Sequence, residues 1–511
     1  MIPRAAALGA ASGALYWMGL PGHAGWGCAV LSFAPLAAAA ARGPRVGAVA
    51  GAAMGIVASA ASLAFLPRVL VARADVQPGL AWAALLAAVV ATAAPFAAMV
   101  AGAAWLARRG VPVALGMGAL HVLVEAHAWR PLSWSIAASL VDAPLAGAWL
   151  GLVGAPLVGG AAGALGASIG AAASGRRAWP LVGAALAVAV AWGVARGRSV
   201  AVTGPHVVVA AIQPGEAEGG PEARDHARWA RHLELSRQAA ARGATLIVGA
   251  EGVVPGVVEP SVAVKAAGTL PATVVVGAVL RDGERVHNSA LVLDRGQVIG
   301  RHDKRALVPL SDRAQACIEE ALGKLAIDPG EADGAVETPA GRVGVAICYE
   351  ELVDGALDRA MEDGAELLLT LSHDEWLAGT DVPERQIAHA RLRAMERERW
   401  LVRASTTGPS ALIDPTGRIV AITPRGASTA LVGEAARATH RPLATSLRAA
   451  WAAVPWAALL FGLAAGEYRR RRAVQSTGDE AEKLTGSVPH GTPPGRFRQE
   501  ADPGEATGGR T

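Results

Sequence analysis

The chain has 511 residues, of which 52% are hydrophobic and only 18% are charged. This composition excludes an ordinary soluble enzyme and predicts a polytopic membrane protein. The formal net charge of +4 comes mostly from short basic loops and a basic tail, so it does not indicate a nucleic-acid partner.

Apolar stretches close to the ~20 residues that a helix needs to cross a bilayer follow one another through residues 1–200. We predict seven membrane-spanning helices there and an eighth after a soluble block, at residues 5–20, 24–41, 46–66, 80–107, 111–127, 148–173, 179–196 and 446–466. The first stretch could also be the apolar core of a signal peptide, but a second apolar segment follows it almost at once.

The sequence therefore predicts four parts. Residues 1–200 form a membrane domain, residues 201–440 a soluble domain, and residues 446–466 a last transmembrane helix. Residues 468–511 are rich in Gly, Pro, Ser and charge, which predicts a disordered tail.

Arginine placement predicts the topology. Cytoplasmic loops of membrane proteins carry an excess of basic residues, and here arginines occupy alternate connections between the predicted helices. They are Arg4, Arg42, Arg45, Arg108, Arg109, Arg176, Arg177 and Arg469–Arg472. We therefore expect the soluble domain on the outer side of the membrane and the tail in the cytoplasm.

The soluble block alternates short, almost continuously apolar runs with helical stretches. This pattern is typical of sheets whose outer faces are covered by helices, and it predicts an α/β sandwich. The predicted strands are residues 207–212, 245–248, 272–279, 290–293, 342–347, 366–371, 400–404 and 410–413, and the two clearest helices are residues 222–242 and 385–399.

Three residues in this block suggest acyl chemistry. Cys348 ends the apolar run 344–347, although a cysteine at a strand end is most often a small buried hydrophobe. Glu251 ends another apolar run, and Lys304 is one of only four lysines among 47 basic residues, so a lysine there indicates a need for a compact charge. A base, a cation and a thiol predict nucleophilic catalysis. A Cys317–Cys348 disulfide remains open as the alternative.

Several sequence runs resemble the nitrilase, or carbon–nitrogen hydrolase, superfamily, whose triad is Glu, Lys and Cys. From residue 1 to about 467 the chain more closely resembles the apolipoprotein N-acyltransferase family, membrane enzymes that add a third acyl chain to bacterial lipoproteins. The runs are residues 287–290, 302–309, 347–350, 372–376, 390–396 and 402–408, with residues 125–134 in the membrane part.

The resemblance implies roles for the three residues. Glu251 would be the general base, Cys348 the nucleophile, and Lys304 the stabiliser of the thiolate and the oxyanion. The implied donor is a phospholipid, and the implied acceptor is the α-amine of diacylglyceryl-cysteine at a lipoprotein N-terminus. The implied location is the bacterial inner membrane, with the catalytic domain facing the periplasm, and no metal or cofactor is implied.

Four further residues follow from the same resemblance. The backbone N–H of Tyr349 would help to bind the oxyanion. Glu350 and Asp312 would support the site, with simple surface or structural hydrogen bonding as the equal alternative. Tyr349 and Trp376 would line the acyl pocket, although core packing also explains Trp376.

The chain departs from the family pattern around this triad. Gly249-Ala250 replace Trp-Pro before the glutamate, residues 310–312 replace Phe-Gly-Glu, residues 373–377 replace Asn-Asp-x-Trp-Phe, and Gln386 stands where His is common. Two other functions therefore stay open. One is a membrane-tethered amidase or nitrilase that acts on a small amide, and the other is a non-catalytic lipoprotein-binding paralogue.

Overall fold

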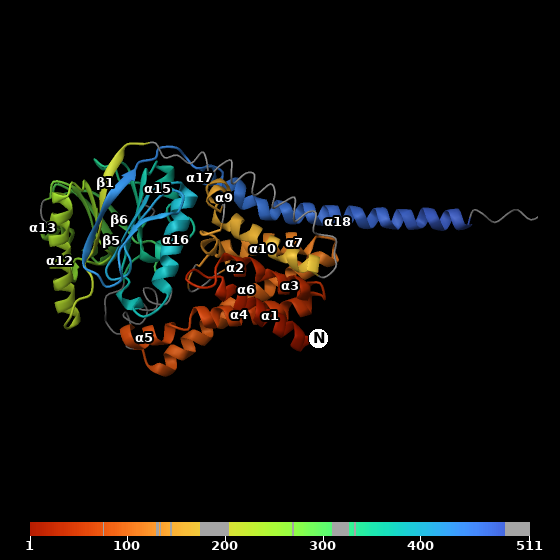
Figure 1. The fold of residues 1–511 in the computed structure, drawn as a ribbon. Helices are drawn as coiled ribbons and strands as arrows, with labels where there is room; N and C mark the ends of the chain where they lie inside the picture. Colours follow the sequence, from red (N-terminus) through yellow and green to blue (C-terminus); the bar gives the residue numbers. More distant parts are fainter. Residues whose placement is uncertain are drawn as a thin grey trace, which may run out of the picture.

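A computed structural model describes residues 1–74, 76–128, 132, 134–143, 146–173, 204–267, 270–308, 327–331 and 334–485. The chain forms a helical part and an α/β sandwich that pack against each other (Figure 1). The predicted span 179–196 and the residues Asp312 and Cys317 lie outside the described ranges.

The helical part is built from the first ten helices. Their bounds are α1 (Ile2–Met18), α2 (Trp26–Leu31), α3 (Phe33–Ala40), α4 (Pro44–Ser62), α5 (Leu66–Ala74), α6 (Pro78–Arg108), α7 (Val113–His127), α8 (Ile136–Ser139), α9 (Ala146–Val153) and α10 (Ala155–Ala173). Small residues let these helices approach closely. A Cβ added at Gly51 of α4 would lie 2.3 Å from the carbonyl oxygen of Phe96 in α6.

Four of the described helices are long and apolar enough to cross a membrane: α4, α6, α10 and the Arg448–Thr477 part of α18 (Arg448–Thr485). The helices at Trp26–Ala40 and Val113–His127 are apolar but shorter. The sequence prediction of several apolar helices is therefore confirmed, whereas its number of about eight spans remains a prediction.

Several helices differ from their predicted bounds, and two of the differences are clear. The stretch 148–173 is predicted as one span, but the chain breaks at Gly154, whose φ is +81°. A backbone N–H at the start of α10, that of Ala155, then donates to a carboxylate oxygen of Glu396 at 2.9 Å. The last helix, α18, continues to Thr485, well beyond the predicted end at residue 466 (Figure 1).

The sandwich contains two sheets. The first has seven strands in the order β12–β1–β2–β4–β5–β6, with β3 beside β4, and the second has five in the order β11–β10–β9–β8–β7. Their bounds are β1 (His206–Gln213), β2 (Leu246–Val248), β3 (Val257–Val258), β4 (Thr273–Asp282), β5 (Arg285–Asp294), β6 (Gln297–Asp303), β7 (Val343–Ile347), β8 (Leu367–Ser372), β9 (Leu401–Ser405), β10 (Ala411–Ile413), β11 (Ile419–Ile422) and β12 (Thr429–Ala436).

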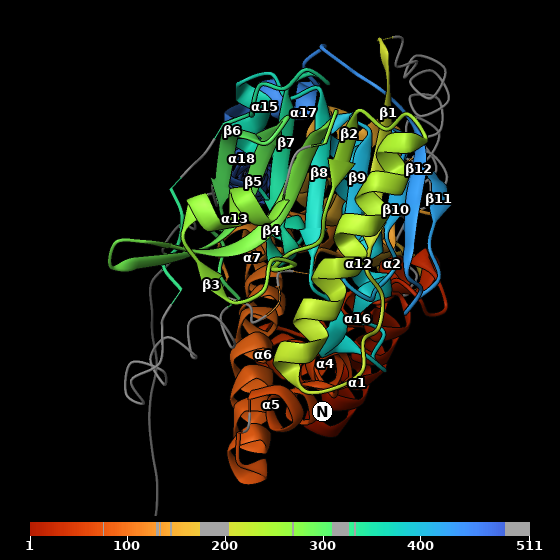
Figure 2. The ribbon, with the colours of Figure 1, turned by 90° about the vertical axis from the view of Figure 1, so that its left-hand side faces the viewer.

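Each strand sends alternate side chains to opposite faces of its sheet, and both faces are buried in strands such as β2, β7, β8 and β9. In β7, Val345 and Ile347 enter the core between the sheets with Val209 and Val248. Ala346, between them, packs outward against the helical layer. The helices α12 (Pro221–Ala241) and α13 (Pro260–Ala267) cover the first sheet, and α15 (Asp358–Glu362) and α16 (Val382–Arg397) cover the second, as predicted (Figure 2). The short helices η1 (Cys348–Glu351), η2 (Glu375–Leu377) and α17 (Leu443–Ser446) complete the described elements.

Helix α16 joins the two parts because it is buried on both sides. Ala390 and Ala394 pack on the second sheet, while Leu392 and Met395 pack against α8, α9 and α10 of the helical part. Glu396 lies at this junction and also accepts a hydrogen bond of 2.6 Å from Arg393. Burial acts to raise the pKa of Glu396, but Arg397, Arg393 and the Ala155 N–H outweigh it and lower the pKa to about 2.

We expect Glu396→Ala to lower the free energy of unfolding by about 3 to 5 kcal/mol, because it removes the nearest carboxylate of the buried Arg393 and one of the two carboxylates beside the buried Arg397. The melting temperature of the detergent-solubilised protein measures this loss. The matched control Glu234→Ala removes an exposed carboxylate that pairs only with its helix neighbours, and should leave the melting temperature unchanged.

The same carboxylate predicts a pH dependence. Its pKa in the folded chain, about 2, lies below its ordinary value of 4.5. The stabilisation is therefore complete above pH 4.5 and is lost as the pH falls towards 2. A Glu396→Ala variant that is as stable as the unmodified protein near neutral pH would contradict this assignment.

Candidate active site

The three residues predicted to carry the chemistry lie at the ends of strands in both sheets. Glu251 follows β2, and Lys304 follows β6 in the first sheet. Cys348 follows β7 in the second sheet. All three side chains are buried. The structure thus brings residues from three separate segments to one end of the sandwich.

Glu251 and Lys304 form a buried ion pair. The Lys304 Nζ lies 3.0 Å from Glu251 Oε1. Asn288 of β5 donates its Nδ2–H to the same oxygen at 2.7 Å, and its backbone carbonyl accepts from the Lys304 N–H at 2.8 Å. Asn288 therefore positions both charged groups. Asn288 lies in the sequence run 287–290, but the sequence alone does not show that it is hydrogen-bonded to Glu251 and Lys304.

A glycine lets the Glu251 loop approach the sheet. A Cβ added at Gly277 of β4 would lie 2.3 Å from the Ala250 carbonyl oxygen and 2.7 Å from the Glu251 Cα. No larger residue fits this position without moving the loop that carries the carboxylate.

Cys348 occupies a strained turn between β7 and η1. Its φ is +49°, in the left-handed region that L residues other than Gly, Asn and Asp rarely adopt. Strand-to-helix turns of this kind carry the nucleophile in some hydrolases. Strain of this type is often found at functional sites.

Glu350 fastens this turn to the segment that follows Lys304. One carboxylate oxygen accepts from the N–H of Ile347 at 2.8 Å and pairs with His302 Nε2 at 2.8 Å. The other accepts from the N–H groups of Arg305 at 2.8 Å and Ala306 at 3.2 Å. Burial acts to raise the pKa of Glu350, but the His302 hydrogen bond and the backbone donors outweigh it and lower the pKa. Glu350 is thus a structural support of the site.

The charges around Cys348 keep its resting thiol protonated. Burial raises the pKa of the Cys348 thiol well above its ordinary value, and the negative charge of Glu251 raises it further. The positive charge of Lys304 lowers the pKa, whereas Asp374 and Glu351 raise it. The thiol is free of any disulfide, and it needs a base before it can attack a substrate.

An apolar pocket lies against the Cys348 side chain. Tyr349 and Trp376 line it, and residues of the helical part complete its wall; that this pocket holds an acyl chain remains a prediction. The lining residues are Phe65, Leu132, Val308, Cys348, Tyr349, Leu352, Trp376, Leu377, Val382 and Gln386. The pocket therefore belongs to both parts of the chain.

The loop that carries Trp376 is anchored to the sandwich. Its neighbour Glu375 pairs with Arg228 of α12 at 2.8 Å and with His373 at 3.7 Å. Hydrogen bonding from His373 and Arg228 lowers the pKa of Glu375 to about 2, against the effect of partial burial. The carboxylate stays ionised, so the anchor persists over the ordinary pH range.

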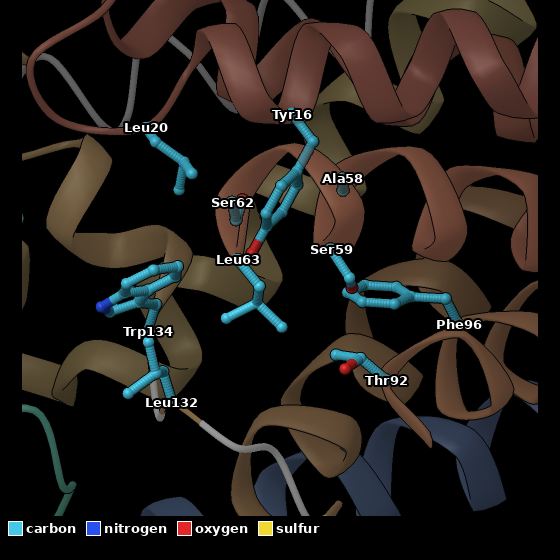
Figure 3. A pocket seen from close by; sticks show the side chains of 10 residues that line it. All are labelled: Tyr16, Leu20, Ala58, Ser59, Ser62, Leu63, Thr92, Phe96, Leu132 and Trp134. Carbon is cyan, nitrogen blue, oxygen red and sulfur yellow. The ribbon is translucent and has the colours of Figure 1, made fainter. Parts of the chain in front are cut away.

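A second cavity, lined mostly by apolar residues, lies in the helical part, with an empty volume of about 470 Å³ that includes space open to the surroundings. Leu132 lines both cavities. Figure 3 shows the Tyr16 ring between Trp134 on one side and Phe96 on the other. The remaining lining residues are Leu20, Ala58, Ser59, Ser62, Leu63 and Thr92.

Asp312, which was predicted to support the site, lies outside the described residues, so its role remains a prediction. Over the described ranges, no group of three or more His, Cys, Asp or Glu side chains could hold a metal ion.

A family model described as carbon–nitrogen hydrolase matches residues 208–445. Residues 208–445 are a carbon–nitrogen hydrolase domain. This stretch contains Glu251, Lys304 and Cys348 and coincides with the sandwich.

Curated relatives named apolipoprotein N-acyltransferase are similar to the chain. The protein from Geobacter metallireducens is 34% identical over 217 residues, covering 39% of this chain and 42% of the relative. The protein from Synechocystis sp. is 30% identical over 203 residues, covering 37% of this chain and 38% of the relative. The chain thus spans about two-fifths of the length of these relatives.

A solved structure is also similar. Saccharomyces cerevisiae Nit3, a member of branch 10 of the nitrilase superfamily, matches with a TM-score of 0.37 and 20% identity, covering 48% of this chain and 94% of Nit3.

We expect Glu350→Gln to destabilise the protein by about 1 to 3 kcal/mol, because its amide NH₂ must face a buried donor that the carboxylate now satisfies. The melting temperature measures the loss, and slower alkylation of Cys348 reports the displaced turn. The control Glu362→Gln changes an exposed carboxylate 3.9 Å from Arg359 and should change neither quantity. Equal behaviour of the two variants would contradict the role given to Glu350.

Proposed function

We propose that the protein is an apolipoprotein N-acyltransferase that uses Glu251, Lys304 and Cys348. It would transfer an acyl chain from a phospholipid to the α-amine of diacylglyceryl-cysteine at a lipoprotein N-terminus. The observation that carries this proposal is the apolar pocket at Cys348, whose wall includes Phe65 and Leu132 of the helical part. The similarity to curated apolipoprotein N-acyltransferases supports the same activity.

The first half-reaction forms a thioester. The Glu251 carboxylate takes the Cys348 proton, and the thiolate attacks the carbonyl carbon of the phospholipid ester. The Lys304 ammonium and the Tyr349 N–H stabilise the oxyanion. When the intermediate collapses, the carbon–oxygen bond breaks, and the departing lysophospholipid oxygen takes the proton from Glu251.

The second half-reaction forms the amide. The α-amine of the acceptor gives a proton to Glu251 and attacks the thioester carbonyl. The carbon–sulfur bond then breaks, and the sulfur of Cys348 recovers the proton. Glu251 therefore returns to its starting state, and the cycle needs no metal or other cofactor.

An apolar site favours transfer over hydrolysis, because it excludes bulk water and admits a lipid-bound amine. The pocket beside Cys348 and the larger cavity of the helical part share Leu132 as a lining residue. These cavities would hold the acyl chain. A hydrolase acting on a small amide would instead need a polar opening to water.

The proposed setting is the inner membrane of a bacterium, crossed about eight times. The four long apolar helices support membrane insertion. The alternating arginines support a periplasmic position for the carbon–nitrogen hydrolase domain.

The first experiment is intact-mass spectrometry of the purified full chain after incubation with phosphatidylethanolamine. We expect a mass gain of one acyl chain that hydroxylamine removes, because hydroxylamine cleaves thioesters. Cys348→Ala should abolish the gain, whereas the matched control Cys28→Ala should retain it. Absence of the adduct in folded protein would favour the non-catalytic paralogue.

A second incubation with a diacylglyceryl lipopeptide tests the acceptor. We expect the adduct to disappear as the lipopeptide gains one acyl chain on its α-amine. Release of free fatty acid from an unchanged lipopeptide would reject the acyltransferase and favour a hydrolase.

We expect Leu132→Trp to shift donor preference towards shorter acyl chains by about tenfold or more, because the larger indole ring reduces the space in the two cavities that Leu132 lines. Competition between phosphatidylethanolamines of different chain length, read from the mass of the adduct, measures this change. The control Leu86→Trp alters a residue that is 65% exposed on α6. Unchanged preference in Leu132→Trp would place the acyl chain elsewhere.

A further inference from the structure

Gln386 of α16 contacts the sulfur of Cys348. Its side chain is buried, it lines the same pocket, and its Nε2 lies 4.0 Å from Cys348 Sγ. The sequence showed only that this glutamine replaces a common histidine. No role in the proposed reaction follows from the triad itself.

The orientation of the Gln386 amide is fixed by its second partner. Gln386 Oε1 accepts a hydrogen bond of 3.2 Å from Arg403 Nη2. A guanidinium only donates, so the oxygen must face Arg403 and the NH₂ group must face the sulfur. The amide therefore presents a donor to Cys348.

Arg403 is itself held rigidly within the domain. Its guanidinium is fully buried and bonds to Asp374 at 3.1 Å and Glu351 at 3.4 Å. It also donates to Ser372 Oγ at 3.0 Å and to the Pro409 carbonyl oxygen at 2.7 Å. Gln386 is thus aimed at the sulfur by a network that cannot turn without breaking several buried hydrogen bonds.

We propose that Gln386 stabilises the ionised form of Cys348 by donating its Nε2–H to the thiolate. A thiolate is a stronger acceptor than a thiol, so this hydrogen bond favours the charged form. Gln386 exchanges no proton, since the proton of the thiol passes to Glu251. This inference rests on the proposed function only in taking Cys348 as the nucleophile.

The charges that face Cys348 explain the need for such a donor. Glu251, Asp374 and Glu351 disfavour the thiolate, and Lys304 alone among the groups with a marked effect favours it. The charge of Glu351 itself changes near neutral pH, since burial raises the pKa of Glu351 to about 7 against the opposing effect of Arg403. A neutral donor stabilises the thiolate at every pH in this range.

The test is the pH dependence of Cys348 alkylation by iodoacetamide in the detergent-purified full chain. The rate is read from the peptide that contains Cys348, so the other cysteines do not contribute. Gln386→Met removes the donor at similar side-chain volume, and we expect its alkylation midpoint to rise by about one pH unit, the size of one charge-assisted hydrogen bond. Gln386→His restores an N–H donor and should return the midpoint towards that of the unmodified protein.

Two further variants keep the test decisive. Gln386→Glu keeps the side-chain shape and the Arg403 partner but replaces the donor by a carboxylate oxygen. We therefore expect its alkylation midpoint to rise further than that of Gln386→Met. This variant carries the test if Gln386→Met does not fold. Gln238→Glu adds the same charge on the exposed face of α12 and should leave the midpoint unchanged. An unaltered alkylation midpoint in folded Gln386→Met would overturn the proposal. If Gln386→Met does not fold, an unaltered midpoint in Gln386→Glu would overturn it.

Alkylation needs no lipid, so the two proposals fail separately. A shifted midpoint in Gln386→Met, together with no adduct from phosphatidylethanolamine, would reject the acyl transfer and support the donor role of Gln386. A normal adduct with an unshifted midpoint would support the acyl transfer and reject the donor role of Gln386.

Discussion

The structure depends on burying one highly charged helix on both of its sides. Helix α16 carries Arg385, Arg393 and Arg397, and all three are almost inaccessible. Such burial is stable only when each charge has a partner. Glu396 and Asp358 supply carboxylates for the last two, and Asp381 pairs with Arg385. Because the same helix also places Gln386 beside the Cys348 sulfur, its position decides both the junction of the two parts and the geometry of the candidate site.

The site combines a rigid polar side with an apolar side. Glu251, Asn288 and Lys304 come from the first sheet and are joined by hydrogen bonds of 3.0 Å or less. Cys348 comes from the second sheet, and Glu350 connects its turn to the backbone after Lys304. The apolar side is formed by residues of both parts of the chain, including Phe65 and Leu132 of the helical part. In the proposed reaction, the polar side would supply the base and the positive charge, and the apolar side would select the substrates that reach them.

Much of the sandwich could be predicted from the sequence because its strands are apolar on both faces. The predicted strands at 207–212 and 342–347 match β1 and β7 to within one residue, and residues 222–242 match α12 equally well. The strand β6 was missed, because Gln297, Arg301 and His302 make it polar and only its pairing with β5 defines it. The break between α9 and α10 was also missed, since its carboxylate partner is distant in sequence.

The candidate triad could be predicted from motif order, whereas its supports could not. Cys348, Glu251 and Lys304 each follow a strand, and the fold brings strand ends together. The contacts that place Asn288 and Gln386 in the site are made with Glu251 and Cys348, which lie 37 and 38 residues away in the sequence. No local pattern in the chain encodes such partnerships, because hydrogen-bond geometry is set by the packing of whole sheets.

The Glu396 hydrogen bond to the start of α10 has a consequence for biosynthesis. Ala155 leaves the ribosome 241 residues before its partner is made. During that interval the first turn of α10 must rely on water or lipid headgroups for its unpaired N–H groups. The final seating of this helix therefore waits until the second sheet has folded and delivered α16. The α/β sandwich, which is synthesised after α10, therefore completes the assembly of the helical part.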